Sequence, residues 1–357
     1  MTTKQSVLAL LKAAPDFVSG EDLAQTCAVS RTSVWKAIKS LQAEGHHIEA
    51  VSNRGYKLTA SADPINGAYI AEKIAALGIK AGSVSGFAEI DSTLSESKRQ
   101  CASVSAFRTA TGELTPQGAK VHRSLIVAGK QTAGRGRMGR SFVSPPESGV
   151  YFTLIYAPKH GVTNPALLTA AAAVAVARAC DELFGTDAKI KWVNDVFLNG
   201  KKICGILTEG VANFETGRIE AANVGIGINV RNMGFTGQLA HIATSITEAA
   251  PDKAKAASVS RNDLVAHVAA NLLRFYDAWE SNDQKTISDC MAEYRSRSFL
   301  IGKTVTVNPA AGLEGKSYDV TVLDIADDAS LVVELSDGSK KSLQSGEVSL
   351  HSATFTC

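Results

Sequence analysis

Residues 191–207 read KWVNDVFLNGKKICGIL, and this stretch decides the fold class. Its Asn199-Gly200 pair stands between two apolar runs, which is the strongest short-range signal for a β-hairpin. More strands are predicted around this hairpin, at residues 124–129, 149–156, 188–195 and 219–230. Long helices are predicted at residues 164–184 and 261–279. Strands in succession with helices set to one side predict an α+β fold rather than a doubly wound parallel sheet.

Composition limits the kind of protein. The chain has 357 residues, of which 45% are hydrophobic and 20% charged, and its formal net charge is +2. This length indicates two or three domains, and the apolar fraction excludes a disordered chain. A near-neutral balance excludes coating of nucleic acid by bulk charge, although it allows one small DNA-reading module. The six cysteines are scattered without metal-binding spacing, which is typical of a reducing compartment.

We expect a cytoplasmic protein without a membrane partner. The first 20 residues predict an amphipathic helix with Lys12 inside the apolar pattern, rather than a signal peptide. The longest charge-free apolar stretch, residues 165–177, is too short to span a bilayer.

Residues 1–60 are predicted to form a winged helix-turn-helix domain. A first helix precedes two short helices, and the last of these is capped by Ser30 and carries no acid until Glu44. Two strands then flank residues 52–55 as a hairpin, or wing. The residues predicted to contact DNA are Ser30, Arg31, Ser33, Lys36 and Arg54. The alternative is a three-helix protein-interaction module with a solvated basic face.

Two further domains are expected after a short linker at residues 60–64. Residues 66–298 mix strands and helices and form the central domain. Residues 299–357 contain short strands separated by Gly, Asp and Ser, which predicts a small β-barrel or sandwich.

The central domain contains a glycine- and arginine-rich segment, QTAGRGRMGR, at residues 131–140. Gly134, Gly136 and Gly139 satisfy G-x-G-x-x-G, but no helix follows and no acid stands about twenty residues later, which disfavours a dinucleotide site. Three arginines in such a loop are better suited to folding over an anion, with backbone amides and guanidinium groups on its oxygens. The alternative is a flexible basic surface loop.

The hairpin region offers a second set of polar side chains. Asn194 and Asp195 can hydrogen-bond a base or hold a hard cation. Lys202 is flanked by apolar residues on the return strand, which predicts a cation pinned inside a site. The alternative for Lys202 is an edge-strand lysine that opposes aggregation. The sequence contains no serine-hydrolase elbow, zinc-protease motif or P-loop.

Five ordered motifs resemble those of the biotin–protein ligases. They are Ile90-Asp-Ser-Thr93, Gln131–Arg140, Lys191-Trp-Val-Asn-Asp195, Lys202-Ile-Cys-Gly-Ile-Leu207 and Gly225-Ile-Gly-Ile-Asn229. With the helix-turn-helix in front and Gly346-Glu-Val-Ser-Leu350 near the end, the chain is similar to the bifunctional BirA type, which also represses the biotin operon. The resemblance covers nearly the whole chain, and it implies that residues 299–357 form an SH3-like β-barrel.

The resemblance implies a two-step, ATP-dependent and AMP-forming ligase reaction. Biotin and Mg-ATP would give biotinyl-5′-AMP and pyrophosphate, and a lysine on the carrier domain of a carboxylase would then accept the biotin. The adenylate would also act as co-repressor, by promoting a homodimer whose two helix-turn-helix domains span a palindromic operator.

Residue roles are carried over from the same motifs. Lys202, Arg135 and Arg137 are the implied catalytic residues, and Asp195 is the implied ligand of Mg²⁺. The implied biotin-binding residues are Ser92, Thr93, Leu94, Gln131, Gly134, Arg135, Gly136, Arg137, Lys202 and Gly205. The implied ATP- or adenylate-binding residues are Arg137, Arg140, Lys191, Asn194, Asp195 and Asn229.

The chain departs from the family pattern at a few positions. Leu94 stands where Asn is usual, Val193 where Pro is usual, and Phe142 where Trp is frequent. Residues 101–123 are longer than the family norm and predict a surface loop.

Two rival functions remain open. The first is a lipoate or octanoate ligase, and the Gly-Arg-Gly-Arg loop and the DNA module argue against it. The second is a transcription regulator that binds biotin or its adenylate without transferring it. Intact Lys202, Arg135 and Asp195 argue against the second rival.

Overall fold

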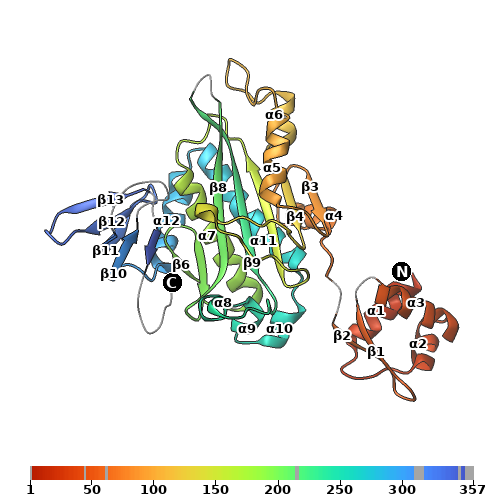
Figure 1. Ribbon diagram of the computed structural model, residues 1–357. Helices are drawn as coiled ribbons and strands as arrows, with labels where there is room; N and C mark the ends of the chain where they lie inside the picture. Colours follow the sequence, from red (N-terminus) through yellow and green to blue (C-terminus); the bar gives the residue numbers. More distant parts are fainter. Residues whose placement is uncertain are drawn as a thin grey trace. The chain divides into compact units, whose positions relative to one another are not determined.

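Figure 1 shows the computed structural model of the chain. It describes residues 2–43, 46–60, 63–213, 217–308, 317–344 and 347–349. The chain divides into two compact units, Met1–Pro64 and Ile65–Cys357. Within the described residues, no helix combines the length and the apolar character that crossing a membrane requires.

The first unit consists of three helices and a two-stranded antiparallel sheet. The elements are α1 (Thr3–Ala13), α2 (Gly20–Thr26), α3 (Arg31–Ala43), β1 (His47–Val51) and β2 (Gly55–Ala60). Apolar residues at helical spacing face one another and exclude water. They are Val7, Leu11, Leu23, Ala24, Val34, Ala37, Ile38 and Leu41, joined by Ile48 of β1. This is the winged helix-turn-helix that the sequence predicts.

Two serines begin the second and third helices of this unit. Ser19 Oγ accepts a hydrogen bond from the Asp22 amide over 3.0 Å, and Ser30 Oγ accepts one from the Ser33 amide over 3.2 Å. Each cap satisfies an amide that the helix itself leaves without a partner. The predicted end of α3 at residues 44–45 lies outside the described residues.

The second unit is built on a seven-stranded sheet with the order β3-β4-β5-β9-β8-β7-β6. The strands are β3 (Val84–Phe87), β4 (Leu125–Ala128), β5 (Gly149–Tyr156), β6 (Lys189–Lys191), β7 (Asp195–Leu198), β8 (Lys201–Ala212) and β9 (Ile219–Asn229). β3 and β4 are parallel, and every other neighbouring pair is antiparallel. Asn199 and Gly200, both with positive φ, form the predicted hairpin turn. The α+β class is confirmed.

Two long helices, α7 (Pro165–Phe184) and α11 (Arg261–Glu280), pack against the sheet and contribute to the main core (Figure 1). Side chains alternate between the two faces of a strand, so Phe152 and Leu154 of β5 join this core. Thr153 points to the other face, where α5 begins. The remaining helices are α4 (Gly67–Ala76), α5 (Thr93–Ala102), α6 (Pro116–Val121), α8 (Gln238–Ile242), α9 (Ile246–Ala249), α10 (Lys253–Ser258) and α12 (Gln284–Arg297).

Residues 101–123 pack onto the sheet and are not only a surface loop. Phe107 and Val121 join a second apolar cluster that also contains Ile126 and Ile155 of the sheet. The expectation was incomplete because the few apolar residues are spaced among Ser, Thr and Gly and form no regular pattern.

The predicted strand at residues 188–195 is wrong in one respect, because the structure divides it. A turn at residues 192–194 separates β6 from β7, which begins at Asp195. The side chain of Asn194 donates a hydrogen bond from Nδ2 to the Ile206 carbonyl on β8 over 2.9 Å. Ile206 is not a sequence neighbour of Asn194. The apolar pattern of residues 188–195 therefore predicts one continuous strand and gives no sign of the turn.

A five-stranded antiparallel sheet follows α12, with the order β13-β12-β11-β10-β14. Its strands are β10 (Thr304–Asn308), β11 (Tyr318–Ile325), β12 (Leu331–Glu334), β13 (Lys340–Leu343) and β14 (Glu347–Ser349). Alternating Val and Leu residues bury one face of it. Of the sequence motif at residues 346–350, only 347–349 lie within the described residues.

Candidate functional site

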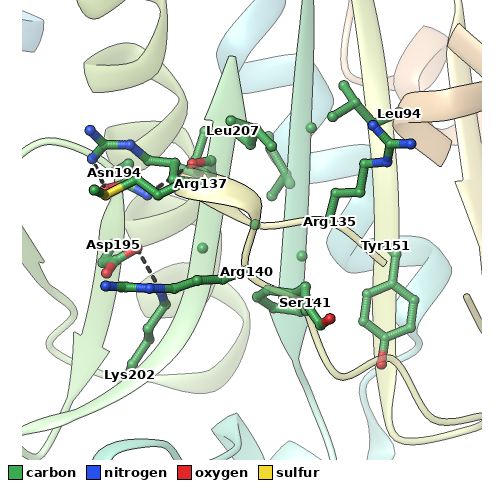
Figure 2. Close-up of a pocket in the computed structure, with 18 of the residues that line it drawn as sticks. Leu94, Arg135, Arg137, Arg140, Ser141, Tyr151, Asn194, Asp195, Lys202 and Leu207 are labelled. Atoms are coloured by element: carbon green, nitrogen blue, oxygen red, sulfur yellow. Dashed lines mark hydrogen bonds and ion pairs between the residues drawn. The ribbon is translucent and has the colours of Figure 1, made fainter. Parts of the chain in front are cut away.

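A pocket lies between the loop 131–142, the start of α5 and strands β5, β8 and β9 (Figure 2). It brings together most of the residues that the motifs single out. Those that line it are Ser92, Thr93, Leu94, Gln131, Arg135, Gly136, Arg137, Arg140, Lys191, Asn194, Asp195, Lys202 and Gly205. Segments separated by more than a hundred positions in the sequence therefore meet at one site.

One end of the pocket is neutral and carries a network of hydrogen bonds. Gln131 Oε1 accepts from the Thr93 amide over 2.9 Å and from the Thr93 hydroxyl over 3.2 Å. Gln131 Nε2 donates to the Ser144 hydroxyl over 3.0 Å, and the Thr153 hydroxyl donates to that of Thr93 over 3.0 Å. Since the network spans α5, the loop and β5, it fixes these polar groups before any ligand arrives.

The start of α5 and the base of the loop form one rigid piece. Ser92 caps the helix, and the Arg99 guanidinium contacts both carboxylate oxygens of Asp91 over 2.8 Å. These hydrogen bonds hold the pKa of Asp91 at about 2, far below its usual range. The Ala133 amide donates to the carbonyl of the same Asp91 over 2.8 Å. Asp91 therefore ties the helix to the loop.

The other end of the pocket is crowded with charge (Figure 2). Lys202 Nζ lies 2.7 Å from Asp195 Oδ1, and Arg137 Nη1 donates to Asn194 Oδ1 over 2.9 Å. Arg140 also extends toward Asp195, whereas Arg135 extends toward the neutral end of the pocket. The loop is thus folded down on the strand ends and held there by polar contacts.

Positive charge dominates this site. Asp195 is the only carboxylate among the lining residues that the structure describes. Five cationic side chains line the same pocket, namely Arg135, Arg137, Arg140, Lys191 and Lys202. Lys191 is only 9% exposed, and burial of a cation is costly unless an anion approaches it. The charged end is therefore built to receive anionic oxygens.

The turn at residues 192–194 explains how this charge is placed. It makes Lys191 and Asp195 direct partners across β6 and β7. The hydroxyl of Tyr294, a buried residue of α12, donates to the Val193 carbonyl over 3.1 Å and so supports the turn. The side chain of Asn194 is occupied on both sides, by Arg137 and by the Ile206 carbonyl. Asn194 therefore anchors the loop to β8.

Two glycines form the floor of the pocket. Gly205 of β8 and Gly227 of β9 are paired across the sheet, and the ring of Phe142 lies over them. An added Cβ at Gly227 would lie 2.6 Å from this ring, and one at Gly205 would lie 3.1 Å from the ring and 3.2 Å from Lys202 Nζ. Because these positions carry no side chains, the Phe142 ring and the end of the Lys202 side chain can lie directly against the sheet.

Some lining residues were not found by sequence reasoning. Tyr151 is buried beside Phe142, with the ring centroids 6.1 Å apart, and burial raises the pKa of its hydroxyl above the usual range. Trp192 and Val348 also line the pocket. The Trp192 indole N–H donates to the Ala329 carbonyl over 2.8 Å, so the C-terminal sheet supports the site. The available signal was the position of Trp192 and Val348 within their motifs.

Two predicted site residues do not line the pocket. Gly134 lies behind the loop, where a Cβ would meet the Phe142 carbonyl oxygen at 2.4 Å, so it allows close packing. Asn229 is buried and donates from Nδ2 to the Thr244 carbonyl over 3.1 Å. Its Oδ1 is buried with no hydrogen-bond partner in the described part of the chain. Gly134 and Asn229 therefore lie behind the pocket walls and support them.

The predicted DNA-contacting residues lie in the first unit. Arg31, Ser33 and Lys36 lie along α3, and Ser30 caps its start. Arg54 lies in the turn between β1 and β2 and has partners within the unit. Its guanidinium stacks on Phe17 at 4.2 Å from the ring centroid and pairs with Asp16 at 3.3 Å.

Comparisons with known proteins match both units. Residues 104–229 match the biotin/lipoate A/B protein ligase family, and residues 3–57 match a helix-turn-helix domain family. The chain is 33% identical over 332 residues to the bifunctional ligase/repressor BirA of Bacillus subtilis, covering 92% of this chain and 93% of that protein. It is 29% identical over 229 residues to BirA of Escherichia coli, covering 64% of each chain.

The fold has counterparts among solved structures. A structure of biotin protein ligase from Aquifex aeolicus in complex with biotin and ATP is 23% identical, with a TM-score of 0.57. The similarity covers 74% of this chain and 97% of the other.

Proposed function

Since the chain belongs to the bifunctional ligase/repressor family of BirA, we propose that it forms biotinyl-5′-AMP from biotin and ATP and then transfers the biotinyl group to a carboxylase carrier protein. It is a biotin protein ligase that carries a helix-turn-helix repressor domain. The observation that carries the proposal is the asymmetry of the pocket. A neutral, hydrogen-bonded end and a cationic end match a ligand with an uncharged polar head and a carboxylate tail.

The first chemical step joins two anions, so positioning and charge compensation decide its rate. A carboxylate oxygen of biotin bonds to the α-phosphorus of ATP while the bond to the pyrophosphate oxygen breaks. We assign Lys202 to the biotin carboxylate and α-phosphate, with Arg135 and Arg137 on the negative charge that develops. Asp195 pairs with Lys202 over 2.7 Å, and the two substrate anions would compete with it for this lysine.

The neutral end suits the ureido head of biotin. Ser92, Thr93 and Gln131 present hydroxyl and amide groups there, and Leu94 supplies an apolar wall. Because Thr93 and Gln131 already bond to each other, their remaining donors and acceptors are held in fixed directions. Such preorganisation reduces the entropy lost on binding.

Magnesium fits the site as a companion of ATP. Mg²⁺ is usually held by one or two carboxylates together with substrate phosphates and waters. The pocket provides one carboxylate, Asp195, and the described residues contain no cluster of three His, Cys, Asp or Glu side chains. We assign Asp195 as the side chain that would hold a Mg²⁺ entering with the phosphates, and the ion would neutralise part of their charge. Arg140 and Lys191 are assigned to the nucleotide.

The second step transfers biotin to the carrier protein. The uncharged amine of an acceptor lysine attacks the carbonyl carbon of the mixed anhydride, AMP leaves with the bridging oxygen, and the amine loses a proton. Water would hydrolyse the same anhydride. The loop held down by Arg137 and Asn194 limits its access.

Exchange of radiolabelled pyrophosphate into ATP tests the first step. Exchange that requires biotin supports the proposal, whereas exchange with lipoate or octanoate would identify the other branch of the matched family. Absence of exchange with every acid, from folded protein, would leave a biotin-sensing regulator as the better description. Transfer is measured separately with a purified carrier domain.

The repressor half of the proposal concerns assembly. We propose that the adenylate promotes a homodimer and that the dimer binds a palindromic operator through its helix-turn-helix domains. A cytoplasmic location agrees with the free cysteines among the described residues. Sedimentation and DNA binding, each with and without biotin plus ATP, test this half. Ligand-independent binding would contradict the switch.

A further inference from the structure

Trp35 is an exposed aromatic residue on the third helix of the first unit. Its side chain is 51% exposed, although large aromatic side chains are usually covered. Helix α3 buries Val34, Ile38 and Leu41 in the core of the unit. Trp35 belongs neither to this core nor to the partly buried residues packed against it. Its ring therefore does not stabilise the unit by packing inside it.

The neighbours of Trp35 on the helix surface are basic. Residues four apart lie one above the other on a helix, so Arg31 and Lys39 flank Trp35 along one face. Both are exposed, and Lys36 lies on the adjacent surface. A ring between two cations is unfavourable for binding an apolar partner, but it suits a ligand that offers phosphates on either side of its bases.

A shallow groove opens beside this ring. It is lined by Arg31, Thr32 and Trp35 of α3, by residues 50–53 and 55–56 of the wing, and by residues 19–21 at the start of α2. Glu21 pairs with Arg31 over 3.5 Å at the surface, where phosphates can compete for the arginine. The first residues of a recognition helix are those that reach base edges in helix-turn-helix proteins. Trp35 is the fifth residue of α3, which places it in the part of the helix that reaches the bases.

We propose that Trp35 contacts base pairs in the major groove and reads thymine through the C5-methyl group. A ring has no charge to place on a phosphate, but it offers an apolar surface to that methyl. Arg31 and Lys39 then meet the phosphates on either side. This inference rests on the proposed DNA-binding function and adds to it the residue that supplies sequence preference.

The experiment begins with the full chain in the presence of biotin and ATP. Binding sites are selected from a library of duplexes with a randomised centre, using the unchanged chain and Trp35→Ala. The unchanged chain is expected to select a motif that contains thymine. The Trp35→Ala variant is expected to lose its preference for thymine at one or two positions. The affinity for thymine relative to the other bases at those positions should fall by roughly ten- to a hundred-fold.

Two controls separate a base contact from a phosphate contact. Trp35→Ala should leave the dependence of affinity on salt unchanged, whereas Lys36→Ala should reduce the slope by about one released counterion. Replacing the selected thymines by uracil, which lacks the methyl, should weaken binding of the unchanged chain and have no further effect on Trp35→Ala. Trp35→Phe should retain part of the preference.

Several results would overturn the inference. If Trp35→Ala selects the same motif with the same affinity, Trp35 does not read bases, while DNA binding itself stands. If uracil has no effect on the unchanged chain, the methyl contact is wrong. A uniform loss of affinity together with a lower melting temperature of Trp35→Ala would assign the residue a structural role. Failure of the unchanged chain to bind any duplex would remove both the proposed DNA binding and the inference.

Discussion

Gly205 and Gly227 face each other across strands β8 and β9, and together they form a floor on which the Phe142 ring rests. Neither glycine has a positive φ, so what each position requires is space rather than backbone freedom. The floor lets a loop residue and a strand residue, Phe142 and Lys202, approach the same point of the sheet.

Gly227→Ala tests this floor. The new Cβ would lie 2.6 Å from the Phe142 ring, so the ring and its loop must move away. We expect the KM for biotin in pyrophosphate exchange to rise about ten-fold, with a smaller change in stability. The double variant with Phe142→Ala is the control, because the clash disappears with the ring. If Gly227→Ala raises KM equally in both backgrounds, the floor does not act through Phe142.

Lys202→Ala tests the charged end. We expect the rate of biotin-dependent exchange to fall by at least about a hundred-fold, since the side chain that compensates two anions is lost. The fold should persist, because the Lys202 side chain is one-third exposed and pairs with the carboxylate of Asp195 at the pocket surface. Lys201→Ala is the matched control. Lys201 is the adjacent residue, but its ammonium donates to the Ala240 carbonyl outside the pocket, and its variant should retain exchange.

Trp192→Phe tests the contact with the C-terminal sheet. The substitution keeps an aromatic ring but removes the N–H that donates to the Ala329 carbonyl. Since that carbonyl would be left without its partner, the free energy of unfolding should fall by about 1–3 kcal/mol. Denaturant titration measures this loss, and Trp279→Phe, which removes no hydrogen bond found among the described residues, is the comparison. An unchanged unfolding midpoint would show that the hydrogen bond contributes nothing.

His122 predicts a pH dependence of stability. Burial, with the nearby Arg123 and Arg108 charges, lowers the pKa of this imidazole from 6.5 to about 4. Its Nδ1 accepts a hydrogen bond from the Ala157 amide, which requires the uncharged ring. Because the unfolded chain takes up the proton first, stability is lost as pH falls from about 6.5 toward 4.

The size of this effect follows from the pKa shift. Between pH 6.5 and pH 4, protonation of His122 in the unfolded chain should lower the free energy of unfolding by at most about 3 kcal/mol. Thermal melting of the unchanged chain and of His122→Gln across this range measures it as a difference. The curve of His122→Gln should be flatter between pH 6.5 and 4, and parallel curves would contradict the assignment.

Sequence reasoning succeeded where local rules decide the structure. The Asn199-Gly200 turn and the strand at residues 149–156 were predicted with their observed bounds, since turn chemistry and apolar runs are local signals. The α+β class followed from the order of these elements. Most of the motif residues line one pocket, and Gly134 and Asn229 do not. The family pattern, rather than periodicity, identified these residues.

The failures depended on contacts between distant residues. The turn at residues 192–194 is held by Ile206 and Tyr294, and neither is visible from the neighbouring sequence. Tyr151 reads as one more apolar strand residue, although it reaches the pocket beside Phe142. The pairing of Arg54 with Asp16, 38 positions earlier, is likewise not visible from the local sequence of the wing.

The support that the C-terminal sheet gives to the pocket has a consequence during synthesis. Ala329 accepts the Trp192 indole hydrogen bond, and Val348 contributes to the pocket wall. The helix-turn-helix unit emerges from the ribosome before the second unit and contains its own core. The pocket cannot be completed until β14 has emerged. A nascent chain can therefore fold its helix-turn-helix unit well before the ligand pocket of the second unit is complete.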